Sequence, residues 1–206
     1  DFFKISPRRV FINPWGLNKK LIAGRRPDCA DNASRLKAAL GIGGDFIFSW
    51  GQAFARRRIK ESILAFKKLA LEFSRLQYLV VCADKYNPPL LENLIKQVNA
   101  ELGREAIVYK SYISGEDGLF CLIGAAKLVV YVSSCEAMGL PPLEALCLGV
   151  PSLVADNGLT HEIFGDNAFF VKNPEDVDEI AAKMKEGISD EVKRAQIVAN
   201  RDKIVG

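Results

Sequence analysis

Residues 127–155 read KLVVYVSSCEAMGLPPLEALCLGVPSLVA, and no other stretch indicates the fold class as clearly. An apolar run rich in valine, 127–132, is followed by a loop, by a segment that Pro141 and Pro142 can open as a helix, and by a second apolar run at 152–155. A strand, a helix and a strand in this order are typical of a βαβ unit, whose two strands run in parallel. The stretch therefore predicts part of a parallel sheet.

The same alternation of short apolar runs and longer helical segments continues on both sides of this stretch. We predict further strands at 9–13, 45–49, 77–83, 106–109 and 168–171. Helices are predicted at 32–40, 59–73, 91–98, 116–126, 142–148, 175–185 and from 190 to about 203. The predicted fold class is α/β, a Rossmann-like parallel sheet with helices on both faces.

Composition places the chain among ordinary globular proteins. Of its 206 residues, 49% are hydrophobic and 26% are charged, which argues against disorder. The formal net charge is only +3 and blocks of like charge are short, so we expect no nucleic-acid partner. No apolar run approaches the roughly 18 residues of a membrane span, and no signal-peptide pattern opens the chain.

The cysteines bear on the cellular compartment. They are odd in number, lack C-x-x-C spacing and mostly lie in apolar stretches. We therefore expect reduced core thiols and, because free thiols persist where disulfides do not form, a cytoplasmic location. The five positions are Cys29, Cys82, Cys121, Cys135 and Cys147.

Two carboxylates suggest a ligand. Glu136 lies in the loop after the strand predicted at 127–132, and Glu144 lies in the first turn of the helix predicted at 142–148. Both positions face the edge where the strands of an open parallel sheet end and ligands bind. Carboxylates accept hydrogen bonds from neighbouring sugar hydroxyls, and Gly139 lets backbone N–H groups approach an anion, so sugar plus phosphate is the expected ligand. The alternative is that Glu144 only favours the positive helix end and Glu136 is a solvated loop acid.

A basic cluster, Arg56, Arg57, Arg58 and Lys60, stands where the helix at 59–73 is expected to begin. Cations at an exposed helix N-terminus are disfavoured by about 0.3 to 1 kcal/mol each, so four of them suggest that an anion binds there. The cluster follows a strand and Gly51, which places it at the same ligand edge. A solvated basic face is the alternative interpretation.

The segment 133–151 resembles the donor-binding motif E-G-F-G-L-P-x-x-E-A of family 4 glycosyltransferases, which have the GT-B fold. The two glutamates, the Gly-Leu-Pro core at 139–141 and the Gly-Val-Pro at 149–151 match together. Beyond the motif, 10–17 looks like the stretch that joins the two domains in this family. Residues 51–66 are similar to its G-R-x-x-x-x-K segment, and 159–171 resemble its loop ending in P-E-V-x-G-D-A with the following strand.

Carried over by position, the resemblance implies a role for each matching residue. Glu144 would hold the ribose hydroxyls and Glu136 the transferred sugar. Arg57 and Lys60 would stabilise the charge on the leaving diphosphate, which makes Glu136, Arg57 and Lys60 the candidate catalytic residues. The remaining donor-binding candidates are Met138, Gly139 and Leu140 by their backbone, Tyr112 and Ile113 beside the base, and Gly51.

The resemblance also implies an organisation for the complete protein. Residues 1–44 would be an interdomain segment with the first strand and helix of the domain, and residues 45–206 a donor-binding Rossmann-like domain with C-terminal helices. The two-domain enzyme would transfer a hexose from a nucleotide-diphosphate sugar to an acceptor, with retention of configuration and without cofactor or metal. A glycan, lipid or other acceptor would bind a missing N-terminal domain, which could also contact a membrane, so this chain alone is expected to be inactive.

Departures from the motif support other functions. Gln52 stands where the family has arginine, Arg57 where it has lysine, and Ala137 and Met138 where it has glycine and phenylalanine. These changes favour a non-catalytic nucleotide-binding module. A sugar-nucleotide epimerase or a phosphorylase of the same fold is a further alternative. His161, the only histidine, has no partner at nucleophile spacing, so we interpret it as incidental.

Overall fold

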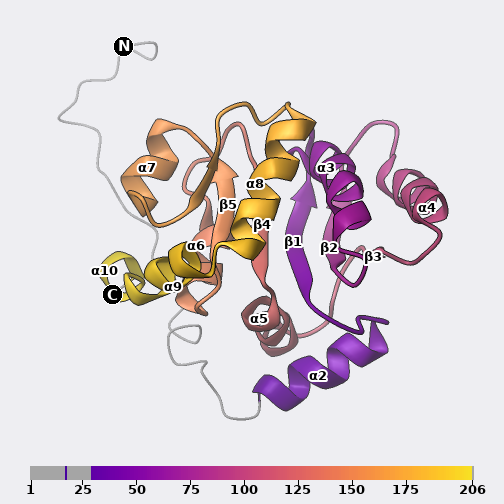
Figure 1. Cartoon of the computed structure of the whole chain (residues 1–206), viewed down its shortest axis with the longest axis horizontal. Coiled ribbons are helices and arrows are strands. Elements are labelled where there is room, and N and C mark those ends of the chain that lie inside the picture. Colours follow the sequence, from indigo (N-terminus) through magenta and orange to yellow (C-terminus); the bar gives the residue numbers. More distant parts are fainter. Residues whose placement is uncertain (1–16, 18–28, 206) are drawn as a thin grey trace.

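The computed structural model describes residue 17 and residues 29–205, and its centre is a six-stranded parallel sheet (Figure 1). The strand order is β3-β2-β1-β4-β5-β6. From β1 the chain first adds strands on one side, β2 and β3, and then on the other side, β4 to β6, so the order reverses between β1 and β4. The predicted Rossmann-like α/β class is therefore confirmed. The strands are β1 (Phe46–Ala53), β2 (Gln77–Asp84), β3 (Ile107–Lys110), β4 (Leu128–Tyr131), β5 (Ser152–Ala155) and β6 (Phe169–Val171).

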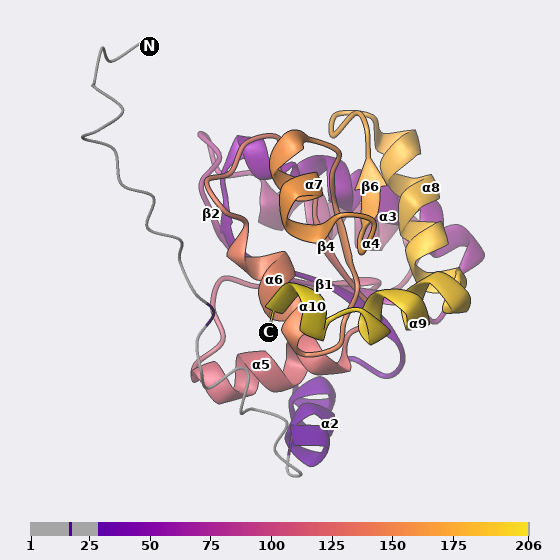
Figure 2. The ribbon, with the colours of Figure 1, turned by 90° about the vertical axis from the view of Figure 1, so that its left-hand side faces the viewer.

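Helices cover both faces of the sheet. Helices α3 and α8 pack side by side on one face with α4 beside α3, while α5 and α6 cover the other face (Figures 1 and 2). Helix α2 packs on the outside of α5. The bounds are α2 (Cys29–Ala39), η2 (Ala55–Arg57), α3 (Ile59–Glu72), α4 (Leu91–Leu102), α5 (Glu116–Ala125), α6 (Leu140–Cys147), α7 (Gly158–Phe164), α8 (Val177–Ser189), α9 (Glu191–Ala199) and α10 (Asp202–Val205).

The buried residues of β1 explain why the sheet needs two covering layers. Phe46 and Phe48 are fully buried in the apolar cluster beneath α5. Ile47, which points to the opposite face because side chains alternate along a strand, is fully buried in the cluster beneath α3 and α8. A strand that is apolar on both faces must be covered on both, as in other parallel sheets.

Most predicted elements are present, with shifts at their ends. The strand predicted at 9–13 lies outside the described residues. Strand β1 continues through Ala53 instead of ending at Ser49, and α6 begins at Leu140 instead of Pro142. The single helix predicted from 190 is two, α9 and α10, and the short helix α7 was not predicted.

The switch point of the sheet, where the strand order reverses, lies between β1 and β4. Strands β1 and β4 pair at Ile47–Leu128 and Phe48–Val129. Beyond these pairs Ser49 joins the two strands, because its hydroxyl donates to the carbonyl of Val130 at 2.6 Å. Since that hydroxyl has a single hydrogen, the Tyr78 hydroxyl 2.7 Å away donates to Ser49 in turn. Ligands of open α/β sheets bind at such a switch point.

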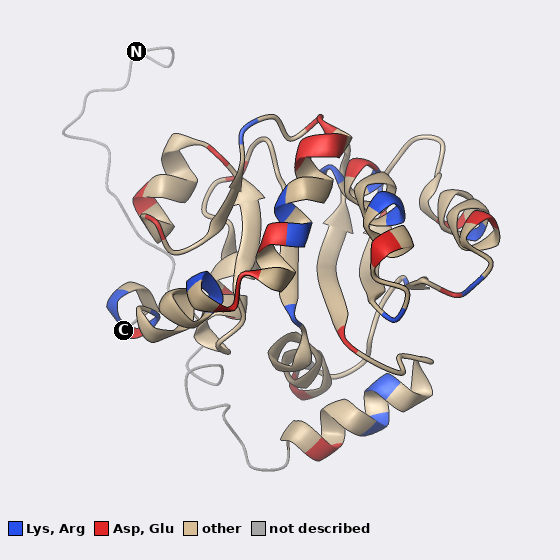
Figure 3. Cartoon of the chain, viewed as in Figure 1, with Lys and Arg blue, Asp and Glu red and all other residues tan. Residues whose placement is uncertain are grey.

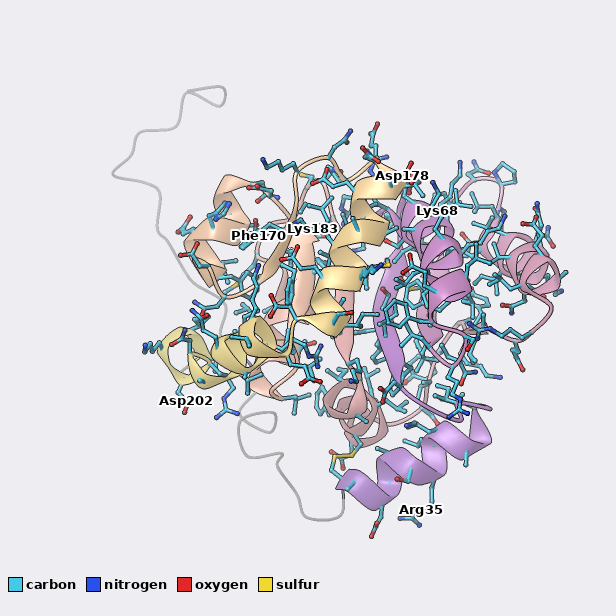
Figure 4. All side chains as sticks on the ribbon, in the orientation of Figure 1. Arg35, Lys68, Phe170, Asp178, Lys183 and Asp202 are labelled. Atoms are coloured by element: carbon cyan, nitrogen blue, oxygen red, sulfur yellow. A yellow bond between two sulfur atoms is a disulfide. The ribbon has the colours of Figure 1, made fainter. Side chains whose placement is uncertain are left out.

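The structure corrects the expectation that all cysteines are reduced. Cys29 of α2 and Cys121 of α5 form a disulfide with an S–S distance of 2.07 Å, visible as the yellow bond in Figure 4. The two residues are 92 positions apart in the chain and meet because α2 packs across α5. Cys82 and Cys147 are buried free thiols, and Cys135 is an exposed one. The cysteines therefore no longer support a reducing compartment.

The outer surface carries charges of both signs, interspersed along α3, α4 and α8 (Figure 3). Lys68 of α3 pairs with Asp178 of α8, both labelled in Figure 4, and Lys185 of α8 pairs with Glu72 of α3. Such exposed pairs add at most about 1 kcal/mol each, so burial holds the two helices together. Within the described residues, every helix is too short or too polar to cross a membrane.

Candidate functional site

The candidate site lies beyond the carboxyl ends of β1 and β4, beside a small pocket lined by Glu136. The loop after β1 carries the basic cluster, and the loop after β4 carries Glu136. The two loops contact each other directly, because the N–H of Ser134 donates to the carbonyl of Arg56 at 2.9 Å. The structure thus brings together two predicted groups that lie far apart in the sequence.

Arg57 is the residue of the basic cluster that points toward both Glu136 and Tyr131. Its Nε donates to Glu136 Oε1 at 3.2 Å, and its guanidinium lies 4.9 Å from the ring centroid of Tyr131. Its side chain is only 16% exposed. Gly51 makes this position available: a Cβ there would lie 2.6 Å from Arg57 Nη1, and the backbone φ of +113° also favours glycine. Gly51 is thus placed in β1 beneath Arg57, where sequence analysis expected a loop.

Glu136 is held by several donors. The Ser133 hydroxyl lies 2.9 Å from Glu136 Oε1, and Arg56 Nε lies 3.9 Å from the same oxygen. These contacts and that of Arg57 all fall on Oε1. The side chain is 16% exposed, so solvent screens the Arg57–Glu136 pair less than it screens a surface pair.

The other basic residues are placed differently. Arg56 stacks on Phe54 at 4.6 Å and its side chain is 42% exposed. Arg58 adopts a left-handed backbone conformation between η2 and α3 and pairs with Glu175, away from Glu136. Lys60 is exposed, and its backbone N–H donates to the Tyr86 hydroxyl at 3.2 Å.

The start of α6 forms the opposite side of the site. Gly139 adopts φ +68° as its N-cap, and no side chain caps the helix. Leu140 is the first helical residue, followed by two prolines, so few N–H groups are available there to bind an anion. Met138 is partly buried against the core. The expectation that Glu144 lies in the first turn is wrong, because α6 begins earlier than predicted; Glu144 follows that turn and is partly buried.

Tyr112 and Ile113, the predicted base-binding pair, follow β3 at the same edge of the sheet. The Tyr112 side chain is 76% exposed and Ile113 packs against the core cluster beneath α5. An exposed aromatic ring at this edge provides a flat apolar surface on which a base could stack.

Sequence analysis missed Tyr131. This last residue of β4 lies under Arg57 and is 7% exposed, and its buried hydroxyl lies close to the Glu136 carboxylate. Burial raises the pKa of Tyr131 more than the charge of Arg57 lowers it, so the hydroxyl keeps its proton at neutral pH. A tyrosine in an apolar strand gives no sequence signal that it will lie beneath an arginine of the site.

His161 is also better connected than the sequence indicated. Its Nε2 lies 2.7 Å from Asp156 Oδ1, and its ring stacks on Phe170 with centroids 4.5 Å apart. Asp156 follows β5, and His161 lies on α7, the helix that the periodicity did not predict. Within the described residues, no group of three or more histidine, cysteine or acidic side chains could hold a metal ion.

Comparisons with known proteins identify relatives of this chain. A family model described as glycosyl transferases group 1 matches residues 33–203. The serotype-specific mannosyltransferase WbdA of Escherichia coli is 30% identical over 173 residues, which cover 83% of this chain and 21% of that protein. The O-antigen chain mannosyltransferase B of E. coli is 32% identical over 138 residues, which cover 66% of this chain and 35% of that one. The chain thus spans only a fraction of the length of these relatives.

Solved structures share the fold. An E. coli trehalose-6-phosphate structure bound with UDP-2-fluoro glucose superposes with a TM-score of 0.77 at 17% identity, covering 92% of this chain and 46% of that one. An α,α-trehalose-phosphate synthase (UDP-forming) from Burkholderia xenovorans gives 0.78 at 16% identity, covering 93% and 47%. At these identities the likeness supports the fold alone.

Proposed function

Because the chain belongs to the group 1 glycosyl transferases, we propose that it is the C-terminal, donor-binding domain of a family 4 glycosyltransferase with the GT-B fold. The complete protein transfers a hexose from a nucleotide-diphosphate sugar to an acceptor, with retention of configuration. The donor-binding domain spans residues 45–206, and residues 1–44 are an interdomain segment with the first strand and helix of the domain. An N-terminal domain holds the acceptor. Nuclear magnetic resonance of the first-formed product tests retention, because it distinguishes the two anomers.

The Arg57–Glu136 pair at the switch point is the observation that carries this proposal. A cation that can bind diphosphate and a carboxylate that can accept from sugar hydroxyls lie 3.2 Å apart, and a nucleotide sugar has both groups as neighbours. Fixed charge at a partly buried site also stabilises a leaving diphosphate more than charge in water does. The arrangement therefore fits the bond between the sugar and the diphosphate, which the reaction breaks.

The Arg57–Glu136 pair also determines which residue binds which part of the donor. Diphosphate oxygens compete with Glu136 for the Arg57 guanidinium, because both are anionic acceptors for the same donors. Once the phosphate binds Arg57, Glu136 faces the sugar hydroxyls, with Ser133 still donating to it. Arg57 is thus a phosphate ligand and Glu136 a sugar ligand, and Lys60 adds positive charge at the same edge.

The rest of the donor lies along the strand ends. Glu144 on α6 binds the ribose hydroxyls, and the backbone of Met138, Gly139 and Leu140 contacts the diphosphate or sugar. The base rests on the loop of Tyr112 and Ile113. No cofactor is needed beyond the donor, and the acceptor is a glycan, a lipid or another molecule. This chain alone transfers no sugar, because half of a cleft cannot orient two substrates. The cytoplasmic location stays a prediction.

Calorimetric titration of the chain with UDP, GDP, ADP and their sugars, repeated with Glu136→Gln, tests this function. Glutamine keeps the shape but removes the charge that competes for Arg57. The variant should bind the nucleoside diphosphate as tightly as the wild type or a few-fold more tightly, because a repulsive charge is removed. It should bind the nucleotide sugar about 10-fold more weakly, because a hydrogen bond to a charged group contributes about 1.5 kcal/mol or more.

Glu92→Gln is the matched control, since Glu92 is an exposed acid on α4 that pairs with Lys96. Its affinities should equal those of the wild type. Absence of binding for every nucleotide in the panel would refute donor binding. Equal affinities of Glu136→Gln and wild type for both kinds of ligand would remove Glu136 from the site.

A further inference from the structure

Arg58 has a backbone conformation that residues with a side chain rarely adopt. It ends η2 and precedes α3 with φ 51° and ψ 34°, in the left-handed region. Among the described residues it is the only one other than glycine with a positive φ. The left-handed region brings the Cβ of an L-residue too close to the following carbonyl oxygen, so such a residue persists only where its surroundings hold it there.

The chain is held by hydrogen bonds on both sides of this turn. Before it, the carbonyl of Arg56 accepts from the N–H of Ser134 at 2.9 Å, in the loop after β4. After it, the carbonyl of Arg58 accepts from the N–H of Ser62 in α3 at 2.9 Å and from the Ser62 hydroxyl at 2.8 Å. Between these two points only the backbone angles of Arg57 and Arg58 can change. The direction of the Arg57 side chain therefore depends on the conformation of Arg58.

Two acidic side chains hold Arg58 in this conformation. Its guanidinium pairs with Glu175, in the loop before α8, and lies 3.8 Å from Glu61 of α3. The Arg58 side chain is 22% exposed and that of Glu61 is 19% exposed, so water screens these charges less than it screens charges on the open surface. A different backbone conformation at Arg58 would point the guanidinium elsewhere and lose both contacts. The ion pairs thus compensate for the unfavourable backbone angles.

We propose that Arg58 is a positioning residue, whose side chain holds a left-handed turn that directs the Arg57 guanidinium toward Glu136 and the donor diphosphate. Arg58 does not bind the donor itself, because its guanidinium is engaged with Glu175 and Glu61. If the turn leaves this conformation, fewer molecules can bind phosphate, and the apparent affinity falls by the same fraction. The phosphate ligand role of Arg57 rests on the proposed function, whereas its contact with Glu136 at 3.2 Å does not.

Two substitutions at position 58 test the proposal, because they separate the side chain from the backbone. Arg58→Ala removes the ion pairs and keeps a residue that disfavours the left-handed region, whereas Arg58→Gly removes the same ion pairs but adopts that region without steric cost. UDP, GDP, ADP and the corresponding nucleosides are titrated calorimetrically into each protein. Arg58→Ala should bind the preferred diphosphate about 10-fold more weakly than the wild type does, because the binding-competent turn is less populated. Arg58→Gly should stay within about 3-fold of the wild type, and nucleoside affinity should change in neither variant.

A second measurement follows Arg57 in the absence of a donor. In nuclear magnetic resonance spectra of the arginine side chains, the Nε–H of Arg57 should exchange slowly with water, because it donates to Glu136. Arg57→Lys identifies this signal by removing it. The signal should be lost by fast exchange in Arg58→Ala and return in Arg58→Gly.

Equal diphosphate affinities of the wild type and Arg58→Ala would overturn the proposal, and if urea denaturation then showed a less stable variant, Arg58 would serve the fold alone. Equal losses in Arg58→Ala and Arg58→Gly would overturn it as well, because the charge of Arg58 rather than the turn would then matter. A wild type that binds no nucleotide would refute the proposed donor function. In that case the Arg57 signal still decides whether Arg58 positions Arg57, since it needs no donor.

Discussion

Arg57 differs from its neighbours because its side chain is fixed between an aromatic ring and a carboxylate. Arg56, next to it, is 42% exposed and rests on Phe54. A guanidinium held in one orientation can bind phosphate with two parallel hydrogen bonds, whereas a mobile one contributes only diffuse charge. The proposed phosphate clamp is therefore a property of one arginine.

Arg57→Ala should weaken the nucleoside diphosphate about 10- to 100-fold, because a charged hydrogen bond contributes about 1.5 to 3 kcal/mol. Nucleoside affinity should change little, since the nucleoside has no phosphate. Calorimetry at two salt concentrations measures this, and raising the salt should reproduce part of the loss. Arg56→Ala is the matched control and should lose less than about 3-fold. Equal losses from both variants would mean a diffuse electrostatic effect and defeat the assignment to Arg57.

The sequence predicted some site residues and not others, for physical reasons. Glu136 and Arg57 carry charge next to glycine and proline signals, so their position at the ligand edge could be inferred. Tyr131 could not be inferred, because its role depends on which strand residue lies under Arg57. The Asp156–His161 contact was missed because α7 has seven residues, too few for an apolar period to appear.

Helix α8 packs closely on the sheet because Gly187 has no side chain. A Cβ at this position would lie 2.8 Å from Leu128 Cδ2 of β4. Gly187→Ala should therefore lower the free energy of unfolding by about 1 to 3 kcal/mol, as overpacking of a core does. Urea denaturation measures the change.

Gly124 provides the matched control, since it lies in α5 and a Cβ added there would meet no described atom within 4 Å beyond its own stretch of helix. Gly124→Ala should leave stability unchanged or raise it by up to about 1 kcal/mol, because alanine restricts the unfolded chain. A Gly187→Ala variant as stable as Gly124→Ala would contradict the close packing of α8 on β4.

Element ends were the least predictable part of the fold. The apolar runs specified where strands lie, but β1 continues past Ser49 because Gly51 to Ala53 still pair with β2. Pairing with a neighbour is a tertiary effect that a local pattern does not contain. The break between α9 and α10 has no proline or glycine to mark it, and so a single helix was predicted.

At the scale of the whole molecule, the disulfide joins α2 to α5 across 92 positions of the chain. Replacing both Cys29 and Cys121 with serine should lower the free energy of unfolding by about 2 to 4 kcal/mol, because a long loop is no longer closed in the unfolded chain. Urea denaturation with and without reductant measures this. Reductant should destabilise the wild type and leave the double variant unaffected.

Nucleotide binding should be unchanged in the double variant, because α2 lies beyond α5, away from the carboxyl ends of the strands (Figure 1). A wild type whose stability ignores reductant would show that the disulfide does not form in solution. Loss of nucleotide affinity in a folded double variant would show that α2 acts on the donor site.

The same disulfide divides the chain into a covalently closed ring and an open part. Strands β1, β2 and β3 lie inside the covalently closed ring between Cys29 and Cys121, while β4, β5 and β6 lie outside it. A force that stretches the chain from its two ends cannot extend the ring, which hides about 300 Å of contour length at roughly 3.3 to 3.6 Å per residue. The tension instead passes through the disulfide to the chain after Cys121, so β4, β5 and β6 can be pulled apart while β1, β2 and β3 stay within the closed ring.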